Sequence, residues 1–317
     1  MLKPVKYLLI ITSLWIVFSC GKKTAPPVSE SMQKQISLLP QNADMVGYIN
    51  VKEISNSDIY KSFVDSMKIN PLDPQTYLKQ INLNLENARV KIEEVYIAYH
   101  DQEKEKMAPF IVAHGKTNLA DYLGALKIKT RDFQIGEDKD FAEGKLYVIN
   151  ADDTLGVGFQ DSSVMVMGNL KEVKSWFQKG KKNPKPDPDL TARLGALQNA
   201  KTGWFLVEAA TLLENLDMVR ALQNVEGARQ IKTADLAFTM DKALRMNSII
   251  TSIDAENAEM IKDAIKGALA SVKLSRRSDR ELTDVVNKIN VEQKDTTIEI
   301  TAQLSLNEIQ KLASLRR

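Results

Sequence analysis

The spacing of apolar and polar residues divides the chain into short segments that predict strands and helices in turn. Residues 45–51, 90–100 and 110–113 have the alternating or continuous apolar pattern of strands. Asn118 and Asn169 each precede a stretch with apolar residues three and four positions apart, which predicts a helix capped at its start. The same reasoning predicts a helix from Ser57 or Asp58 to Met67, a short helix at 75–81, and strands at 146–149, 155–159 and 164–167.

The second half of the chain repeats much of this order. A strand is predicted at 203–207 and a helix at 209–222, and a hairpin follows in which 231–240 pairs with 244–253. The remaining elements are a helix from Ala255, a helix at 279–288, a hairpin of 289–293 with 297–304, and a last helix with Ser305 and Glu308 as its capping box.

Both halves therefore have the order strand, helix, hairpin, helix, strands, helix, and this order predicts the fold class. Hairpins give antiparallel pairing, and helices that cover such a sheet make an α+β fold. We predict two similar antiparallel-sheet modules covered by helices, at residues 37–180 and 193–317, that arose by tandem duplication. The alternative is one larger domain whose elements recur without a common origin.

Two polar segments separate the predicted parts of the chain. Residues 181–192 contain Pro184, Pro186 and Pro188 at alternate positions among charged residues, which is typical of an extended linker. Residues 20–36 offer few apolar side chains for burial, so we predict a flexible tether there.

Residues 1–19 have the layout of a secretory signal peptide. Lys3 and Lys6 precede an apolar run from Tyr7 to Phe18. That run is shorter than the ~20 residues with which a helix spans a bilayer. We therefore expect the segment to be removed after Ser19, and a retained transmembrane helix is the alternative.

The end of this segment resembles the lipobox of bacterial lipoproteins. Val17 and Ser19 precede Cys20, which is the single cysteine of the chain. The resemblance implies cleavage between Ser19 and Cys20, a diacylglycerol thioether on the Cys20 sulfur and, commonly, an acyl chain on its new amino group. A thiolate is readily alkylated, and one cysteine excludes an intrachain disulfide. We therefore predict Cys20 as a lipidation site.

The charge balance narrows the choice of partners. Without residues 1–19 the chain loses Lys3 and Lys6 and no acidic residue, so its formal charge falls from +2 to zero. Nucleic-acid binding requires a basic stripe, and a neutral chain does not favour it. The basic groups at Lys179–Lys185 and around Lys273 and Arg280 are interpreted as solvated surface.

The candidate catalytic and metal-binding residues do not match a known motif. If 95–100 pairs with 109–114, His100 and His114 lie at opposite ends of one hairpin, which favours ordinary strand-end residues over a shared metal site. Ser162 lacks the G-x-S-x-G surroundings of a hydrolase nucleophile and is assigned with its neighbour to a turn. The acidic pairs Asp152 with Asp153 and Asp187 with Asp189 do not have EF-hand spacing.

Two further patterns are assigned to structure. Gly156 and Gly158 lack the third glycine and the following helix of a phosphate-binding loop, so they are assigned to a strand. The pairs Trp176–Phe177 and Trp204–Phe205 are assigned to the core. We accordingly predict no enzymatic activity, no metal and no cofactor other than the lipid on Cys20.

The sequence leaves three functions open. We expect a lipid-anchored envelope protein that binds other envelope proteins, cell-wall polymer or host molecules and is not a catalyst. A carrier of a lipid or other apolar ligand is the alternative, and an enzyme is the third. The stretch 38–51 also resembles the start of uncharacterised bacterial envelope proteins, with Leu39, Pro40, Ala43 and Asp44 before the first strand. Since Lys22 and Lys23, not aspartate, follow Gly21, the outer membrane is the preferred location.

Overall fold

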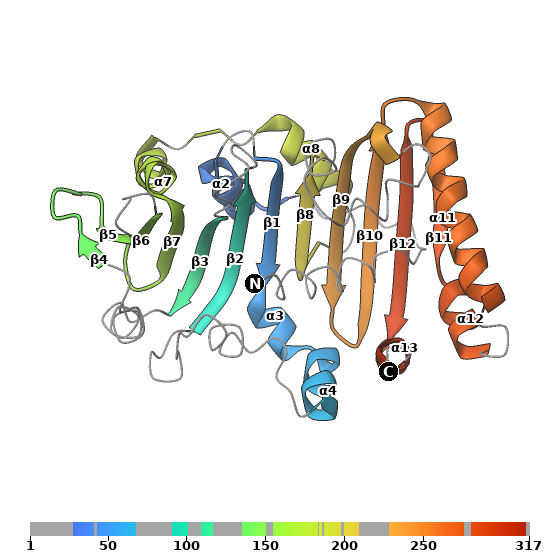
Figure 1. Ribbon diagram of the computed structural model, residues 1–317. Coiled ribbons are helices and arrows are strands. Elements are labelled where there is room, and N and C mark those ends of the chain that lie inside the picture. The colour runs from blue at the N-terminus through green and yellow to red at the C-terminus, as the bar shows by residue number, and fades with distance from the viewer. Residues whose placement is uncertain are drawn as a thin grey trace. The chain divides into compact units, whose positions relative to one another are not determined.

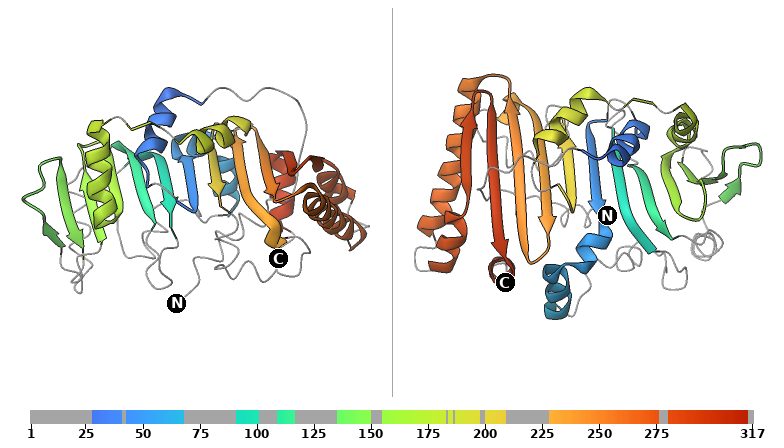
Figure 2. Two further views of the ribbon diagram at one scale, coloured as in Figure 1. Left: turned by 90° about the horizontal axis from the view of Figure 1, so that it is seen from above. Right: turned by 180° about the vertical axis from the view of Figure 1, so that it is seen from behind.

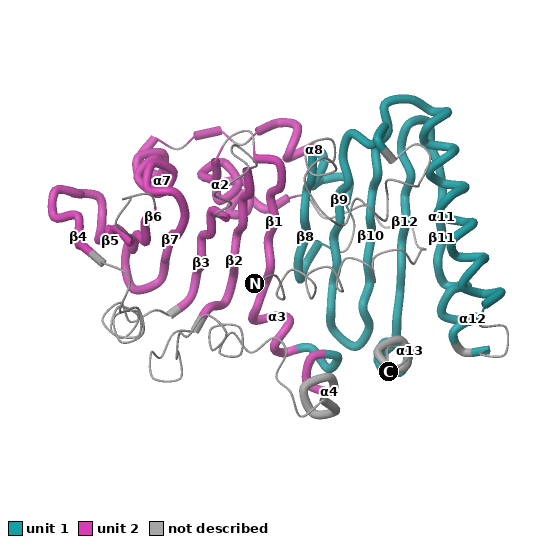
Figure 3. Tube along the Cα trace, in the orientation of Figure 1, with its two compact units in different colours: residues 1–27, 57–59, 193–317 teal, residues 28–56, 60–192 magenta. Residues whose placement is uncertain are grey.

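The protein forms two compact units, which are coloured separately in Figure 3. The structure is a computed structural model. It describes residues 28–40, 43–67, 91–100, 109–116, 135–149, 155–182, 184–185, 187–197, 200–208, 228–275 and 280–314. Unit 2 consists of Val28–Asn56 and Tyr60–Ala192, and unit 1 contains Ser57–Ile59 and Arg193–Arg317. Each described unit combines an antiparallel sheet with helices, which confirms the α+β prediction.

The described sheet of unit 2 is antiparallel throughout (Figure 1). Its strands follow one another across the sheet in the order β1 (Met45–Asn50), β2 (Lys91–Tyr99), β3 (Phe110–Lys116), β7 (Val164–Asn169), β6 (Leu155–Phe159), β5 (Lys145–Ile149) and β4 (Ile135–Glu137). All but β4 were predicted from the hydrophobic pattern, because β4 is only three residues long. Between β1 and β2 lie α3 (Val51–Asn56) and α4 (Asp58–Met67).

Helix α7 (Leu170–Lys182) covers strands β6 and β7 of unit 2 (Figure 2). The Asn169 side chain caps it by accepting a hydrogen bond from the Lys171 N–H at 2.9 Å, as the sequence predicts. Val173, Trp176 and Phe177 form its buried face. Glycines in β6 let this face approach the sheet closely, since a Cβ on Gly158 would lie 2.5 Å from Cε2 of Phe177.

A Gly158→Ala substitution should therefore destabilise unit 2. The added methyl group would meet both Phe177 and Val173, and overpacking of this kind costs about 1–3 kcal/mol. Urea unfolding measures the loss. Gly195→Ala is the matched control, because nothing lies within 4 Å of its Cβ and alanine favours a helix. Equal stability of the Gly158→Ala variant and the wild type would contradict the close packing.

The predicted flexible tether at 20–36 is wrong for its last part, because α2 occupies Glu30–Leu38. The Ser29 side chain caps this helix by accepting a hydrogen bond from the Met32 N–H at 3.2 Å. Ile36, Leu38 and Leu39 are buried, and α2 packs on α7. The buried apolar residues at the end of α2 therefore stabilise this helix, although the polar composition of residues 20–36 does not predict one.

The predicted extended linker at 181–192 is wrong at both of its ends. Helix α7 continues to Lys182, and α8 (Pro188–Ala196) begins before the linker was expected to end. Pro188 occupies the first helical position, where a missing N–H costs nothing, and the Asp187 side chain accepts a hydrogen bond from the Asp189 N–H at 2.8 Å. The prolines therefore mark a helix start as well as a break.

The described sheet of unit 1 is also antiparallel. Its strands follow the order β8 (Gly203–Val207), β9 (Ile231–Met240), β10 (Ala243–Ser252), β12 (Thr297–Ser305) and β11 (Asn290–Lys294), and the short helix η2 (Ala228–Gln230) precedes β9. Helices α11 (Ala255–Ser275), α12 (Arg280–Asn287) and α13 (Leu306–Ser314) complete the unit. None of the helices in the described residues is both long and apolar enough to cross a membrane.

One face of this sheet forms the core of unit 1. Ile298, Ile300, Ala302 and Leu304 alternate along β12 and are all buried. They pack with residues of α11, α12 and α13, which include Ala258, Ile261, Val285 and Ile309. At the start of α13 the Ser305 N–H donates to Glu308 at 2.8 Å, which is the predicted capping box.

The strands of the two units share part of their order. In unit 2 the order β1-β2-β3-β7-β6 joins a three-stranded meander to a later hairpin, and β8-β9-β10-β12-β11 does the same in unit 1. Strands β7 and β12, which come last along the chain in these two series, lead into helices α7 and α13. Unit 2 has the additional strands β5 and β4. A duplication would produce this correspondence, and duplication itself stays a prediction.

Candidate functional site

The predicted lipidation site, Cys20, and the cleavage position at Ser19 lie outside the described residues. The two histidines are described, and they have different partners. His100 Nε2 lies 3.7 Å from Glu172 Oε1, at the end of β2, whereas His114 lies opposite Glu94 in the pairing of β2 with β3. The described residues do not bring three or more histidine, cysteine, aspartate or glutamate side chains together as a metal site.

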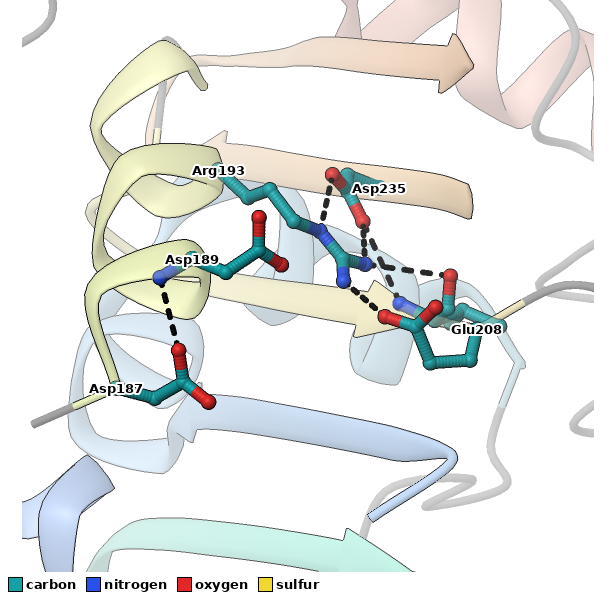
Figure 4. A network of polar contacts seen from close by, with 6 residues as sticks. Asp187, Asp189, Arg193, Glu208 and Asp235 are labelled. Carbon is teal, nitrogen blue, oxygen red and sulfur yellow. Dashed lines mark hydrogen bonds and ion pairs between the residues drawn. The ribbon is translucent and has the colours of Figure 1, made fainter. Parts of the chain in front are cut away.

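The most concentrated polar network of unit 1 surrounds Arg193 on α8 (Figure 4). Its Nε and Nη2 donate to the two carboxylate oxygens of Asp235 at 3.1 and 2.6 Å. Nη1 donates to Glu208, and Nη2 also donates to the Val207 carbonyl at 3.2 Å. Every nitrogen of the guanidinium group therefore has an acceptor.

The central ion pair of this network, between Arg193 and Asp235, is shielded from water. The side chain of Asp235 is 4 % exposed and that of Arg193 is 12 % exposed. Burial alone lowers the pKa of Arg193, but hydrogen bonds and charge from Asp235 and Glu208 outweigh it and raise the pKa. Arg193 stays charged, and its fork geometry fixes α8 on strands β8 and β9.

The same sheet face has a second polar pair. Asn247 is fully buried, and its Nδ2 donates to Glu299 Oε1 at 2.8 Å. Strand alternation places Asp235, Asn247 and Glu299 on the face opposite the helix-covered core. This face is not polar throughout, because the buried residues Trp204 and Ala237 lie on it in register with Asn247. The polar groups named here are satisfied by one another.

In unit 2 a cluster of titratable groups lies on β1, β2 and β3. The Tyr48 hydroxyl donates to Glu94 Oε1 at 3.1 Å, and the rings of Tyr48 and Tyr96 are 4.9 Å apart. His114 meets Tyr96 edge-on at 5.8 Å, and its buried Nε2 has no hydrogen-bond partner among the residues that the structure describes. Burial, followed by the charge of Glu94, raises the pKa values of Tyr48 and Tyr96, so both phenols stay protonated.

His114 should make unit 2 less stable in acid. Burial lowers the pKa of His114 below its ordinary 6.5, although Glu94 and Asp161 oppose the shift. As the pH falls, the unfolded chain therefore binds a proton at His114 before the folded chain does. The contribution of His114 to the free energy of unfolding is complete above pH 6.5 and is lost as the pH falls through the folded pKa. The midpoint of urea unfolding at pH 7.5 and 5.5 measures this effect.

A substitution of His114 and a control substitution test whether His114 causes the pH dependence of stability. His114→Gln should flatten the pH dependence between 7.5 and 5.5, because the titrating group is gone. His100→Gln, at the other end of the hairpin, is the matched control for the substitution itself. An unchanged slope in His114→Gln would show that His114 does not carry the effect.

The other residues considered from sequence have structural roles. Asp161 accepts hydrogen bonds from the Ser163 N–H and hydroxyl, both at 2.6 Å, which is turn chemistry. Asp187 caps α8, and Gly156 and Gly158 lie in β6. Asp152 and Asp153 lie outside the described residues. Trp176 and Trp204 are buried core residues.

A pocket of about 330 Å³ lies by α11 and α12. It is lined by Lys273, Leu274, Arg280, Thr283 and Asp284. Three of these five residues are charged, but the surface that the pocket exposes is mainly apolar.

Sequence analysis did not find the Arg193 network or the Tyr48 cluster. Asp235 stands between Ala234 and Leu236, at a polar position of the alternation in residues 231–240, so the pattern predicts a solvent-facing side chain there. A charge in a half-buried strand needs a partner, but nothing in the sequence names Arg193, 42 positions earlier, as that partner.

Comparison with known proteins leaves the family open. No protein-family model and no curated protein matches the chain. A solved structure described as crystal form I of TP0453 aligns with 93 % of this chain and 98 % of its own, at 10 % sequence identity and a TM-score of 0.48. At this level of similarity neither the fold nor the function of that protein transfers to this chain.

Proposed function

We propose that the protein is a lipid-anchored component of a bacterial cell envelope that works by binding other molecules and does not catalyse a reaction. The observation that carries the proposal is the sequence around Cys20. A lone cysteine directly follows a signal-like apolar segment and Ser19, and it resembles a lipobox. The outer membrane is the proposed location, because lysines and not aspartate follow Gly21.

The described polar groups support a binding protein over an enzyme. Arg193 has acceptors on all three nitrogens, and Asp187 and Asp161 are engaged in capping and a turn. Acid–base catalysis needs groups that are free to reach a substrate. Of the acidic residues considered from sequence, the described Asp187 is engaged in capping a helix.

Labelled fatty acid tests the anchor. It should enter the wild-type protein and should not enter Cys20→Ala, because the thioether needs the sulfur. The control is Cys20→Ala combined with Ser31→Cys, which keeps one thiol but moves it away from the signal segment; this protein should also remain unlabelled. Equal labelling of the wild type and Cys20→Ala would contradict the proposal.

A further inference from the structure

The outward side of α7 carries a row of lysines. The positions 171 and 182 fall on the side of the helix opposite the buried Val173, Trp176 and Phe177, and positions 174 and 181 flank that side. Lys185 follows shortly after the helix ends. Lys171, Lys182 and Lys185 are all exposed. We call these three residues the lysine face.

The described acidic side chains near the lysine face pair with other lysines or cap a helix. Lys174 pairs with Asp138 at 2.8 Å, and Lys181 pairs with Glu143 at 3.2 Å. Among the described residues, no ion-pair partner lies within reach of Lys171, Lys182 or Lys185. The acidic residue nearest in sequence to Lys185, Asp187, caps α8 instead.

The helix itself does not account for all of this charge. Lysines in the last turn, such as Lys182, are stabilised by the negative end of the helix dipole. Lys171 lies in the first turn, where the dipole disfavours a cation. The helix dipole therefore does not account for Lys171.

Helix α2 brings the N-terminal chain to this helix. It packs on α7, and Lys179 Nζ donates to the Leu39 carbonyl at 3.0 Å, which ties the end of α2 to α7. Glu30, the first residue of α2, is ten positions after Cys20. Ten residues reach at most about 35 Å when fully extended. A lipid on Cys20 would hold the start of α2 within that distance of the bilayer.

We propose that the lysine face docks on the anionic phospholipid surface of the membrane that carries the anchor. The proposal rests on the proposed function for the nearness of the bilayer. The chemistry is electrostatic: each lysine close to an anionic surface adds attraction that fades within a Debye length, so the contact is sensitive to salt. The docked face would orient unit 2 relative to the membrane, which an acyl anchor alone does not do.

Vesicle binding tests the lysine face. The probe is the chain from residue 20 with Cys20→Ala, mixed with vesicles of phosphatidylcholine alone or with one third phosphatidylglycerol. We expect binding only to the anionic vesicles, and a loss of at least about tenfold for K171E/K182E/K185E at 50 mM salt. The control K242E/K266E/K294E makes the same charge change at three exposed lysines of unit 1 and should bind nearly as the parent does.

Three results would overturn the proposal. These are equal binding to both kinds of vesicle, equal losses in the two triple variants, or retention on an anionic cell-wall polymer without binding to the anionic vesicles. Circular dichroism shows whether each variant is folded. Because the probe carries no acyl chain, its result is independent of the labelling of Cys20, and the two proposals can fail separately.

Discussion

Arg193→Met should destabilise unit 1 by about 3–5 kcal/mol, because it leaves the carboxylate of Asp235 buried without its partner. Methionine preserves most of the side-chain volume, so the loss measures the missing charge and hydrogen bonds. Urea unfolding followed by the fluorescence of buried Trp204, in a Trp176→Phe background, reports on unit 1. A loss below about 1 kcal/mol would contradict the strength assigned to this ion pair.

Two further variants show where the cost comes from. Glu208→Gln removes the partner that is 44 % exposed, and it should cost at most about 1 kcal/mol because water screens that contact. Arg193→Met combined with Asp235→Leu removes both buried charges and should recover most of the stability. If the double variant is as unstable as the single one, lost packing of α8 and not the unpaired carboxylate explains the effect.

Cys20→Ala should move the protein from the membrane fraction to the soluble fraction. Each buried CH₂ of an acyl chain contributes ~0.8 kcal/mol, so two or three chains hold firmly where a single chain binds weakly. The loss of all of them is a larger change than any side-chain substitution can produce. Cell fractionation measures it.

A salt wash separates the lipid from the lysine face. Electrostatic attraction is screened at 1 M salt, where the Debye length is about 3 Å, but the burial of acyl chains is not. The wild type should therefore stay in the membrane fraction after the wash, and Cys20→Ala should leave it. A Cys20→Ala protein that remains bound at high salt would contradict anchoring through this residue.

The hairpins were predictable because their signal is local. In residues 231–252 the alternation runs up to Asp241 and resumes after it, and the structure pairs Leu244 with Met240 around that turn. The capping box of Ser305 and Glu308 is local in the same sense. Strand period and capping depend on neighbours a few positions apart, which a sequence shows directly.

Composition proved a weaker guide than position. The polar content of the segment around Ser29 predicts flexibility, but Ser29 caps α2 and Ile36 and Leu38 are buried. The proline spacing predicts a linker at Pro188, but this residue begins α8. In both cases the deciding feature is where one residue stands relative to a helix start.

The candidate sites depend on contacts that sequence spacing does not encode. The predicted hairpin register placed His114 beside Val95, and a shift by one residue places it opposite Glu94 and next to Tyr96. That single step changes the surroundings of the imidazole from apolar to charged. The pairing of Arg193 with Asp235 joins a helix to a strand 42 positions away, so only the folded chain reveals it.

The mass of the N-terminal peptide of the mature protein, isolated from membranes, tests the central claim most directly. The account predicts that this peptide begins at Cys20 and carries a diacylglycerol group on sulfur, together with an amide-linked acyl chain where the amino group is modified. A peptide that begins at any other residue, or an unmodified Cys20 in protein taken from the membrane, would contradict it.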